Sequence, residues 1–139
     1  MPKTIVQKIR FKNTSPETIY NLYMDSKLHS KVIGGPAKIS KRVGGSYSAH
    51  GDYLSGKNLH LVENELIVQT WRVKSWNKED QDSIFTISLE SKDKDVILHA
   101  IHANVPDHAI AGIKKGWYDH YWNPYKQYLA GKPITRPKM

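Results

Sequence analysis

One segment limits what this chain can fold into: the amphipathic stretch from Asp107 to Ala130. Its apolar positions recur at steps of three and four residues, which places them within an arc of roughly 120° on a helix. These positions are Ile110, Ile113, Trp117, Tyr121, Tyr125 and Tyr128. Most of them carry aromatic rings, and each ring covers a wide apolar area. The pattern predicts one long helix that begins at Asp107 as its cap, is kinked or shifted at Pro124, and packs lengthwise on a broad apolar surface.

The chain before this helix alternates in short stretches that are typical of antiparallel strands. Strands are predicted at 4–12, 37–43, 46–50, 57–62, 66–76, 83–91 and 95–105. Two short helices should follow the first strand, one beginning at Ser15-Pro16-Glu17 and the other covering about 26–32. This order predicts an α+β domain in which a curved antiparallel sheet wraps around the C-terminal helix and can enclose a cavity.

The composition of the chain limits the kinds of protein and of functional site that it can form. At 139 residues we expect a single domain, with a core over about 4–130 and a basic tail over 131–139. The absence of cysteine excludes disulfides, thiolate zinc sites and thiol nucleophiles. We expect no signal peptide or membrane span, and therefore a cytoplasmic protein. The formal charge of +8 favours anionic partners, but the bases do not alternate with exposed aromatic residues as a nucleic-acid site would require.

Several short motifs occur in an order that is similar to a known family. They are Ser15-Pro16-Glu17 with Ile19-Tyr20, Pro36-Ala37, Gly44-Gly45, Gly51, Ser55-Gly56, Ile67-Val68-Gln69-Thr70-Trp71-Arg72, Ser75-Trp76, His102 before Pro106, Gly116-Trp117 and Tyr121-Trp122. Together they resemble the AHSA-type family, named for the activator of the heat-shock protein ninety ATPase, and specifically its C-terminal domain. The resemblance runs from about Ile5 to Leu129. It implies the helix-grip fold of the START-like (SRPBCC) superfamily, which also includes the birch-pollen allergen, with a hydrophobic cavity between sheet and helix. It also implies a link to chaperones and the stress response, but no single activity.

The candidate site consists of residues expected to line that cavity. They are Trp71, His102, Ile113, Trp117 and Tyr121, with Lys114 as a polar anchor for a ligand. Trp71 and Trp117 form an aromatic wall in this interpretation, and the alternative is that they fill the core. His102 shares a strand face with Leu98 and could orient a ligand carboxylate or carbonyl. The alternatives are a buried histidine bonded to backbone and, for Lys114, a side chain that runs along the apolar edge with its ammonium in water.

The sequence favours neither a metal site nor an enzyme. His99 and His102 point to opposite faces of one strand, so they cannot share a metal, and no HExxH motif occurs. We expect no cofactor. The acids fall mostly at predicted turns, and no GxSxG motif marks a nucleophile.

Three hypotheses follow, in order of preference. The first is a soluble binding module that encloses a small hydrophobic or amphipathic ligand between the sheet and the C-terminal helix. The second is a chaperone-interacting domain whose basic surface binds heat-shock protein ninety or another acidic protein. The third is a cyclase-like enzyme, which the missing acid–base set makes the least favoured.

Overall fold

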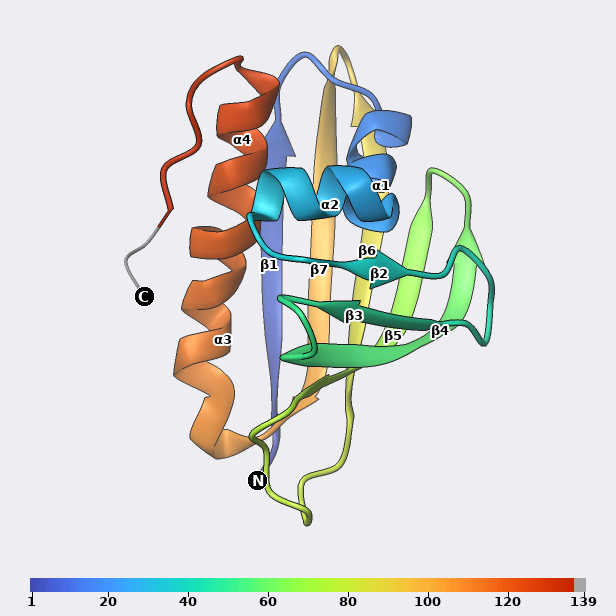
Figure 1. Cartoon of the computed structure of the whole chain (residues 1–139). Coiled ribbons are helices and arrows are strands. Elements are labelled where there is room, and N and C mark those ends of the chain that lie inside the picture. Colours follow the sequence, from blue (N-terminus) through green and yellow to red (C-terminus); the bar gives the residue numbers. More distant parts are fainter. Residues whose placement is uncertain (137–139) are drawn as a thin grey trace.

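An antiparallel sheet of seven strands curves around a C-terminal helical segment in the computed structural model, which describes residues 1–136 (Figure 1). The strands are β1 (Lys3–Phe11), β2 (Lys38–Ile39), β3 (Ser46–Ala49), β4 (Leu54–Val62), β5 (Leu66–Val73), β6 (Ser83–Lys92) and β7 (Asp95–Val105). Their spatial order is β1-β7-β6-β5-β4-β3-β2. The predicted α+β architecture of a curved sheet around a C-terminal helix is confirmed.

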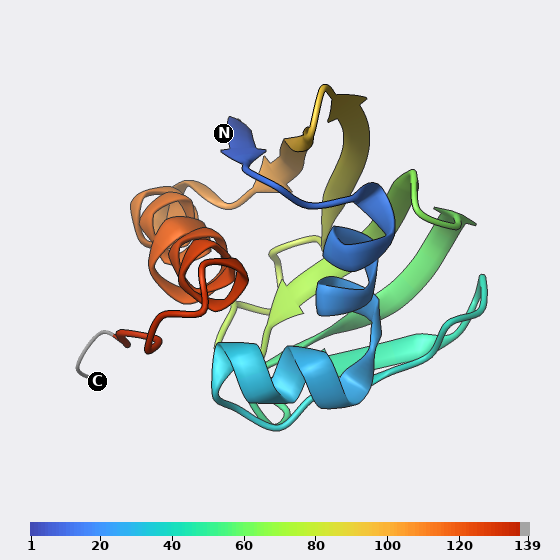
Figure 2. The same ribbon diagram turned by 90° about the horizontal axis from the view of Figure 1, so that it is seen from above.

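Two short helices close one side of the space between the sheet and the C-terminal segment (Figure 2). Helix α1 (Pro16–Met24) begins as predicted, because the Ser15 hydroxyl accepts a hydrogen bond from the Thr18 amide at 3.3 Å. Helix α2 (Ser26–Ile33) ends at Gly34, whose φ of +87° places it in the left-handed region that glycine adopts without steric cost.

Two predicted strands are shorter in the structure. The strand predicted at 37–43 reduces to β2, because the Asn58 side-chain amide donates to the carbonyls of Ser40 and Arg42 and bends the chain into a loop. The strand predicted at 66–76 ends at Val73. Beyond it the Arg72 guanidinium donates to the carbonyls of Asn77 and Asp80 at 2.7 and 2.6 Å, so Arg72 organises the following loop.

The C-terminal helical segment contains two changes of pitch. A 3-10 turn η1 (Asp107–Ala109) leads into α3 (Ile110–Trp117), a π-helical turn η2 (Tyr118–Trp122) and α4 (Asn123–Leu129). The prediction that Asp107 caps this segment is wrong. Its carboxylate instead accepts a hydrogen bond from the N-terminal ammonium of Met1 at 3.1 Å and lies 3.6 Å from the Lys3 ammonium.

The irregularity predicted at Pro124 is confirmed, and it lies in the turn just before that residue. Proline has no amide hydrogen, and the amide of Asn123 bonds to the carbonyl of Tyr118, five residues earlier. In a π turn, residues five apart lie on one face. Trp117 and Trp122 therefore stack, with 5.4 Å between ring centroids and 14° between planes. Trp122 is fully buried, which the regular helical period did not predict, and Ile110, Ile113 and Tyr128 lie half-buried at the margins.

The predicted basic tail is described only as far as Arg136, and Pro137, Lys138 and Met139 lie outside the described residues. The Arg136 guanidinium donates to the carbonyls of Val32 and Lys31 at 2.8 and 3.2 Å, at the C-terminal end of α2. Over residues 1–136, no helix combines the length and apolar character needed to cross a membrane.

Candidate functional site

Strand register assembles one row of side chains across the inner face of the sheet. The partners run in order from Ile5 on β1 through His102, Phe85 and Gln69 to Asn58 on β4. All of them are buried, and three of the five are polar. The row faces the C-terminal helical segment, so the polar side chains must find hydrogen-bond partners inside the fold.

The helix meets this row mainly through Trp117. Its ring stacks on Phe85 with 4.1 Å between centroids and 8° between planes, and it lies 5.8 Å from Trp71. Tyr121 follows one turn later, with its ring centroid 4.8 Å from that of Trp117. Of the predicted wall residues, the structure brings Trp71, His102, Trp117 and Tyr121 together, and the stacked Phe85, Trp117 and Trp122 rings occupy the space between sheet and helix.

Ile113 and Lys114 lie at the edge of this group. Ile113 is half-buried and packs against the margin of the core. Lys114 is exposed, and its backbone carbonyl accepts a hydrogen bond from the Gln7 side-chain amide at 3.0 Å. The oxygen of the same Gln7 amide accepts from the Trp122 indole at 2.8 Å, so Gln7 ties β1 both to α3 and to the end of the π turn. The role of Lys114 as a polar anchor stays a prediction.

Both ring nitrogens of His102 already have partners. Nδ1 accepts from the Trp117 indole at 3.1 Å, and Nε2 donates to the Ser83 hydroxyl at 2.7 Å. The Ser83 hydroxyl in turn donates to the Trp71 carbonyl at 2.7 Å, which is why Nε2 carries the proton. Burial lowers the pKa of His102 to about 3 and keeps the ring neutral. A ligand carboxylate or carbonyl could reach this histidine only by displacing Trp117 or Ser83.

A second polar network contacts the C-terminal helical segment at Tyr121, one turn after Trp117. The Tyr23 hydroxyl donates to Gln69 Oε1 at 2.9 Å, and Gln69 Nε2 donates to Asn58 Oδ1 at 2.9 Å. His29 Nδ1 donates to the Tyr23 carbonyl at 2.8 Å, so Nε2 accepts from the Tyr121 hydroxyl at 3.0 Å. Burial lowers the pKa of His29 to about 4, and the nearby His50 lowers it further. The hydrogen bond to the Tyr23 carbonyl acts in the opposite direction and raises the pKa.

Tyr125 differs from every other polar side chain in the interior. It is fully buried between Phe11, Tyr121 and Trp122. Among the described residues, its hydroxyl is the only buried side-chain polar atom without a hydrogen-bond partner. Burial raises the pKa of this hydroxyl well above its usual range, so it remains a donor. A donor of this kind costs free energy until an acceptor reaches it.

Sequence reasoning did not find most of this polar network. Gln69 and Asn58 lie on strands whose alternation marks them as inward-facing, and an inward amide is the signal that could have identified them. Tyr23 lies on the buried side of α1, where the helical pattern indicates burial but not the partner of the hydroxyl. His29 carried no signal, because its partners Tyr23 and Tyr121 come from separate helices.

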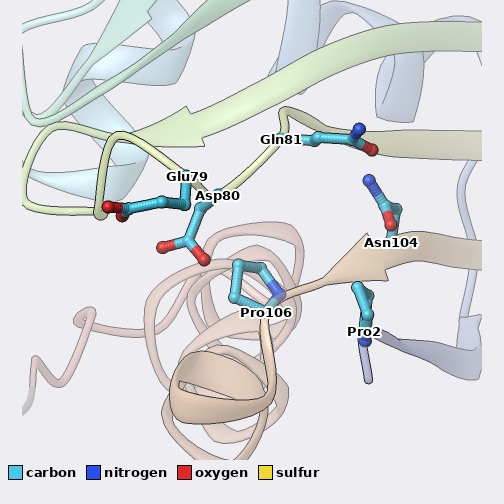
Figure 3. A pocket seen from close by; sticks show the side chains of 6 residues that line it. All are labelled: Pro2, Glu79, Asp80, Gln81, Asn104 and Pro106. Carbon is cyan, nitrogen blue, oxygen red and sulfur yellow. The ribbon is translucent and has the colours of Figure 1, made fainter.

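Two surface pockets lie away from these residues. One of about 310 Å³ is lined by Pro2, Glu79, Asp80, Gln81, Asn104 and Pro106 (Figure 3). Two of its polar side chains already have local partners: Asp80 accepts from His108 at 2.7 Å and from the Asn77 amide, and Asn104 donates to the Asp82 carbonyl. A second, of about 520 Å³, lies at the start of α1 beside Glu63 and Glu65. None of the predicted wall residues lines either pocket.

Within residues 1–136, no three histidine, aspartate or glutamate side chains are placed to hold a metal ion together.

A curved antiparallel sheet packed around a C-terminal helical segment is the helix-grip fold of START-like proteins, and this chain has that fold. The match to a family model makes the assignment specific: residues 13–130 match the model of the Activator of Hsp90 ATPase homolog 1-like protein, and the chain belongs to this family. Solved structures have the same fold. An HSP90 activator from Plasmodium falciparum superposes with a TM-score of 0.85 at 21% identity, over 96% of this chain and 99% of that one. A Mesorhizobium loti protein gives 0.80 at 18% identity, over 95% of this chain and 100% of that one.

Curated relatives are longer than this chain. The human Activator of 90 kDa heat shock protein ATPase homolog 1 is 27% identical over 114 residues, which are 82% of this chain and 33% of the human protein. A Dictyostelium discoideum homologue is 24% identical over 83% of this chain and 30% of its own length. The chain therefore spans about a third of the length of the curated relatives it matches.

Proposed function

We propose that this protein is a chaperone-interacting domain that binds an Hsp90-type chaperone and raises its ATPase rate. The observation that carries the proposal is the family match over residues 13–130, together with the human relative whose name records that activity. The matched part is only a third of the human protein. The experiment must therefore test whether this chain alone stimulates the ATPase.

The geometry of the interior favours a function on the outer surface. Trp117 lies between Phe85 and Trp122, and both ring nitrogens of His102 have partners. Admitting a ligand there would break a stack of three aromatic rings and a bonded histidine. A rigid domain that presents its surface to a protein partner needs neither change.

The direct test is the steady-state ATPase rate of Hsp90 from the same cells, measured while this protein is titrated in. We expect a rate that rises and saturates, and that falls back when salt is added, because a chain with a formal charge of +8 should bind an acidic partner partly through screened charges.

The control is the same titration with an Hsp90-specific inhibitor present, because the rate that remains is hydrolysis by contaminants and is subtracted. No rise in rate, combined with no complex by pull-down at low salt, would refute the proposal.

One observation supports a second candidate, a binding module for a small amphipathic ligand between sheet and helix. The buried Tyr125 hydroxyl has no acceptor among the described residues, and a ligand with a carbonyl or hydroxyl oxygen would supply one. Trp71, His102, Ile113, Trp117 and Tyr121 would form the apolar wall, after movement of the Trp117 ring, and Lys114 would be the polar anchor at its edge.

Native mass spectrometry of the protein purified from its own cells tests this candidate. An added mass that is lost on denaturation, and that is reduced in Tyr125→Phe, would support a ligand. A bare mass in both proteins would refute it.

A further inference from the structure

Two long segments of this chain carry bases and no acid. Between Asp25 and Asp52 there are five bases and no acid, and between Asp119 and residue 136 there are three more bases and no acid. Their number equals the formal net charge of +8, since the remaining bases and the acids number 13 each. We name them the basic face: Lys27, Lys31, Lys38, Lys41, Arg42, Lys126, Lys132 and Arg136. All eight are exposed.

The fold joins the two segments, although about a hundred residues separate their contacting ends. Arg136 donates to the carbonyls of Val32 and Lys31, and the Lys31 ammonium lies 5.9 Å from the centre of the Tyr128 ring on α4. Seen from above, the chain after α4 lies beside the end of α2 (Figure 2). The bases of α2 therefore lie beside those that follow α4, and the bases of β2 and the β2–β3 loop extend the face away from this junction (Figure 1).

A glycine allows this junction. A Cβ atom built on Gly34 would lie 2.5 Å from the Arg136 guanidinium carbon, closer than such atoms approach each other. Glycine at this position therefore ends α2 and leaves room for the guanidinium over the helix terminus, where the carbonyl groups carry partial negative charge.

The acids that border the basic face do not neutralise it. Asp52 pairs with Lys74 at 2.7 Å and Asp119 with Lys115 at 3.9 Å, both partners lying outside the face. Asp25 is 3.7 Å from Lys41 but also caps α2 by accepting the Leu28 amide. Most of the positive potential is thus available to a partner.

We propose that the basic face is the docking surface for an acidic segment of a polypeptide. The identity of that polypeptide rests on the proposed function. That the partner is acidic is inferred from charge complementarity with the basic face. An exposed apolar side chain, Val43 at 61% exposure, stands next to Lys41 and Arg42 at the tip of the β2–β3 loop. It offers an acidic peptide an apolar contact among the charges.

The residue types favour a peptide over a nucleic acid. Of the eight bases six are lysines, and one of the two arginines, Arg136, already uses its guanidinium on α2. Phosphate recognition prefers the paired donors of arginine. Single-stranded nucleic acids also require exposed aromatic rings for stacking, and the exposed large apolar side chain within the two segments is Val43.

Fluorescence anisotropy of a labelled peptide made of glutamate, aspartate and leucine tests the proposal. The face variant is Lys27→Glu, Lys38→Glu and Lys132→Glu. The matched control is Lys8→Glu, Lys78→Glu and Lys92→Glu, which changes the net charge equally at exposed positions on other surfaces. We expect the face variant to weaken binding about tenfold or more, and the control less than about threefold. Amide chemical shifts should change mainly in residues 26–51 and 120–136.

Equal losses in both variants would overturn the proposal, because binding would then follow net charge alone. Tighter binding of a DNA or RNA oligomer, or of vesicles with anionic lipids, would also overturn it in favour of those partners. If the face variant behaves like the control in the chaperone ATPase assay while the wild type still stimulates, this inference fails and the proposed function stands. If the peptide binds the face but no chaperone is stimulated, the proposed function fails and the docking surface stands.

Discussion

The interior beneath the C-terminal helix and the basic face use polar residues in opposite ways. Inside, His102, Gln69 and Asn58 are bonded to fixed partners, and burial keeps His102 neutral. On the basic face, eight exposed cations gather with few acids among them. Because buried groups that lose a partner cost far more than exposed ones, we expect the interior to govern stability and the basic face to govern binding.

The largest effect is expected from Trp117→Ala. The indole stacks on Phe85 and Trp122 and donates to His102, so its loss leaves a cavity and an unpaired acceptor. We expect a loss of about 3–5 kcal/mol in the free energy of unfolding, measured by urea denaturation. Tyr118→Ala, at the neighbouring exposed position, should change it by less than about 1 kcal/mol. Similar losses in both variants would mean that the stack does not hold the interior together.

Lowering the pH should destabilise the interior through His29 and His102. Their pKa values in the fold are about 4 and about 3, below the ordinary value of 6.5. Their contribution is complete above pH 6.5 and is lost as the pH falls, because the unfolded chain then binds protons that the folded chain does not. Each should cost about 2 kcal/mol by pH 5.

Urea midpoints measured between pH 7 and pH 5 check this expectation, since most carboxylates stay ionised in that range. His29→Gln should flatten the pH dependence, whereas His60→Gln, at an exposed position on β4, should leave it unchanged. A stability that does not vary over this range would show that neither histidine is held neutral.

Two tyrosine-to-phenylalanine variants compare a bonded hydroxyl in the interior with one that has no partner among the described residues. Tyr23→Phe leaves Gln69 Oε1 buried without its donor, so we expect a loss of about 1–3 kcal/mol. Tyr125→Phe removes a hydroxyl that has no partner among the described residues, so we expect no loss or a small gain. Thermal and urea unfolding of the pair measures the difference. A comparable loss from Tyr125→Phe would show that its hydroxyl is bonded in solution, as the second candidate function requires.

The smallest effect on stability is expected from the triple variant of the basic face. Lys27, Lys38 and Lys132 are exposed, so their conversion to glutamate should change the free energy of unfolding by less than about 1 kcal/mol. Urea denaturation beside the Lys8, Lys78 and Lys92 control checks it. A loss of several kcal/mol would assign these lysines a structural role and remove the contrast with the interior.

The sequence alone determined the elements and the side of each strand that faces inward. Alternation in β7 placed Leu98, Ala100 and His102 on one face, and the structure buries all three. The three- and four-residue period of the C-terminal segment placed Trp117, Tyr121 and Tyr125 inward for the same local reason. The family resemblance, carried by short motifs in order, was sufficient for the fold class.

Tertiary structure alone decided which side chains meet. The π turn before Pro124 rotated Trp122 into the core, which a regular helical period does not allow. The partners of His102 come from β6 and from the helix, and Arg136 reaches α2 across about a hundred residues of chain. Periodicity reports only the direction in which a side chain leaves its own element. Contacts between elements depend on strand register and helix pitch, which are settled when the whole core packs.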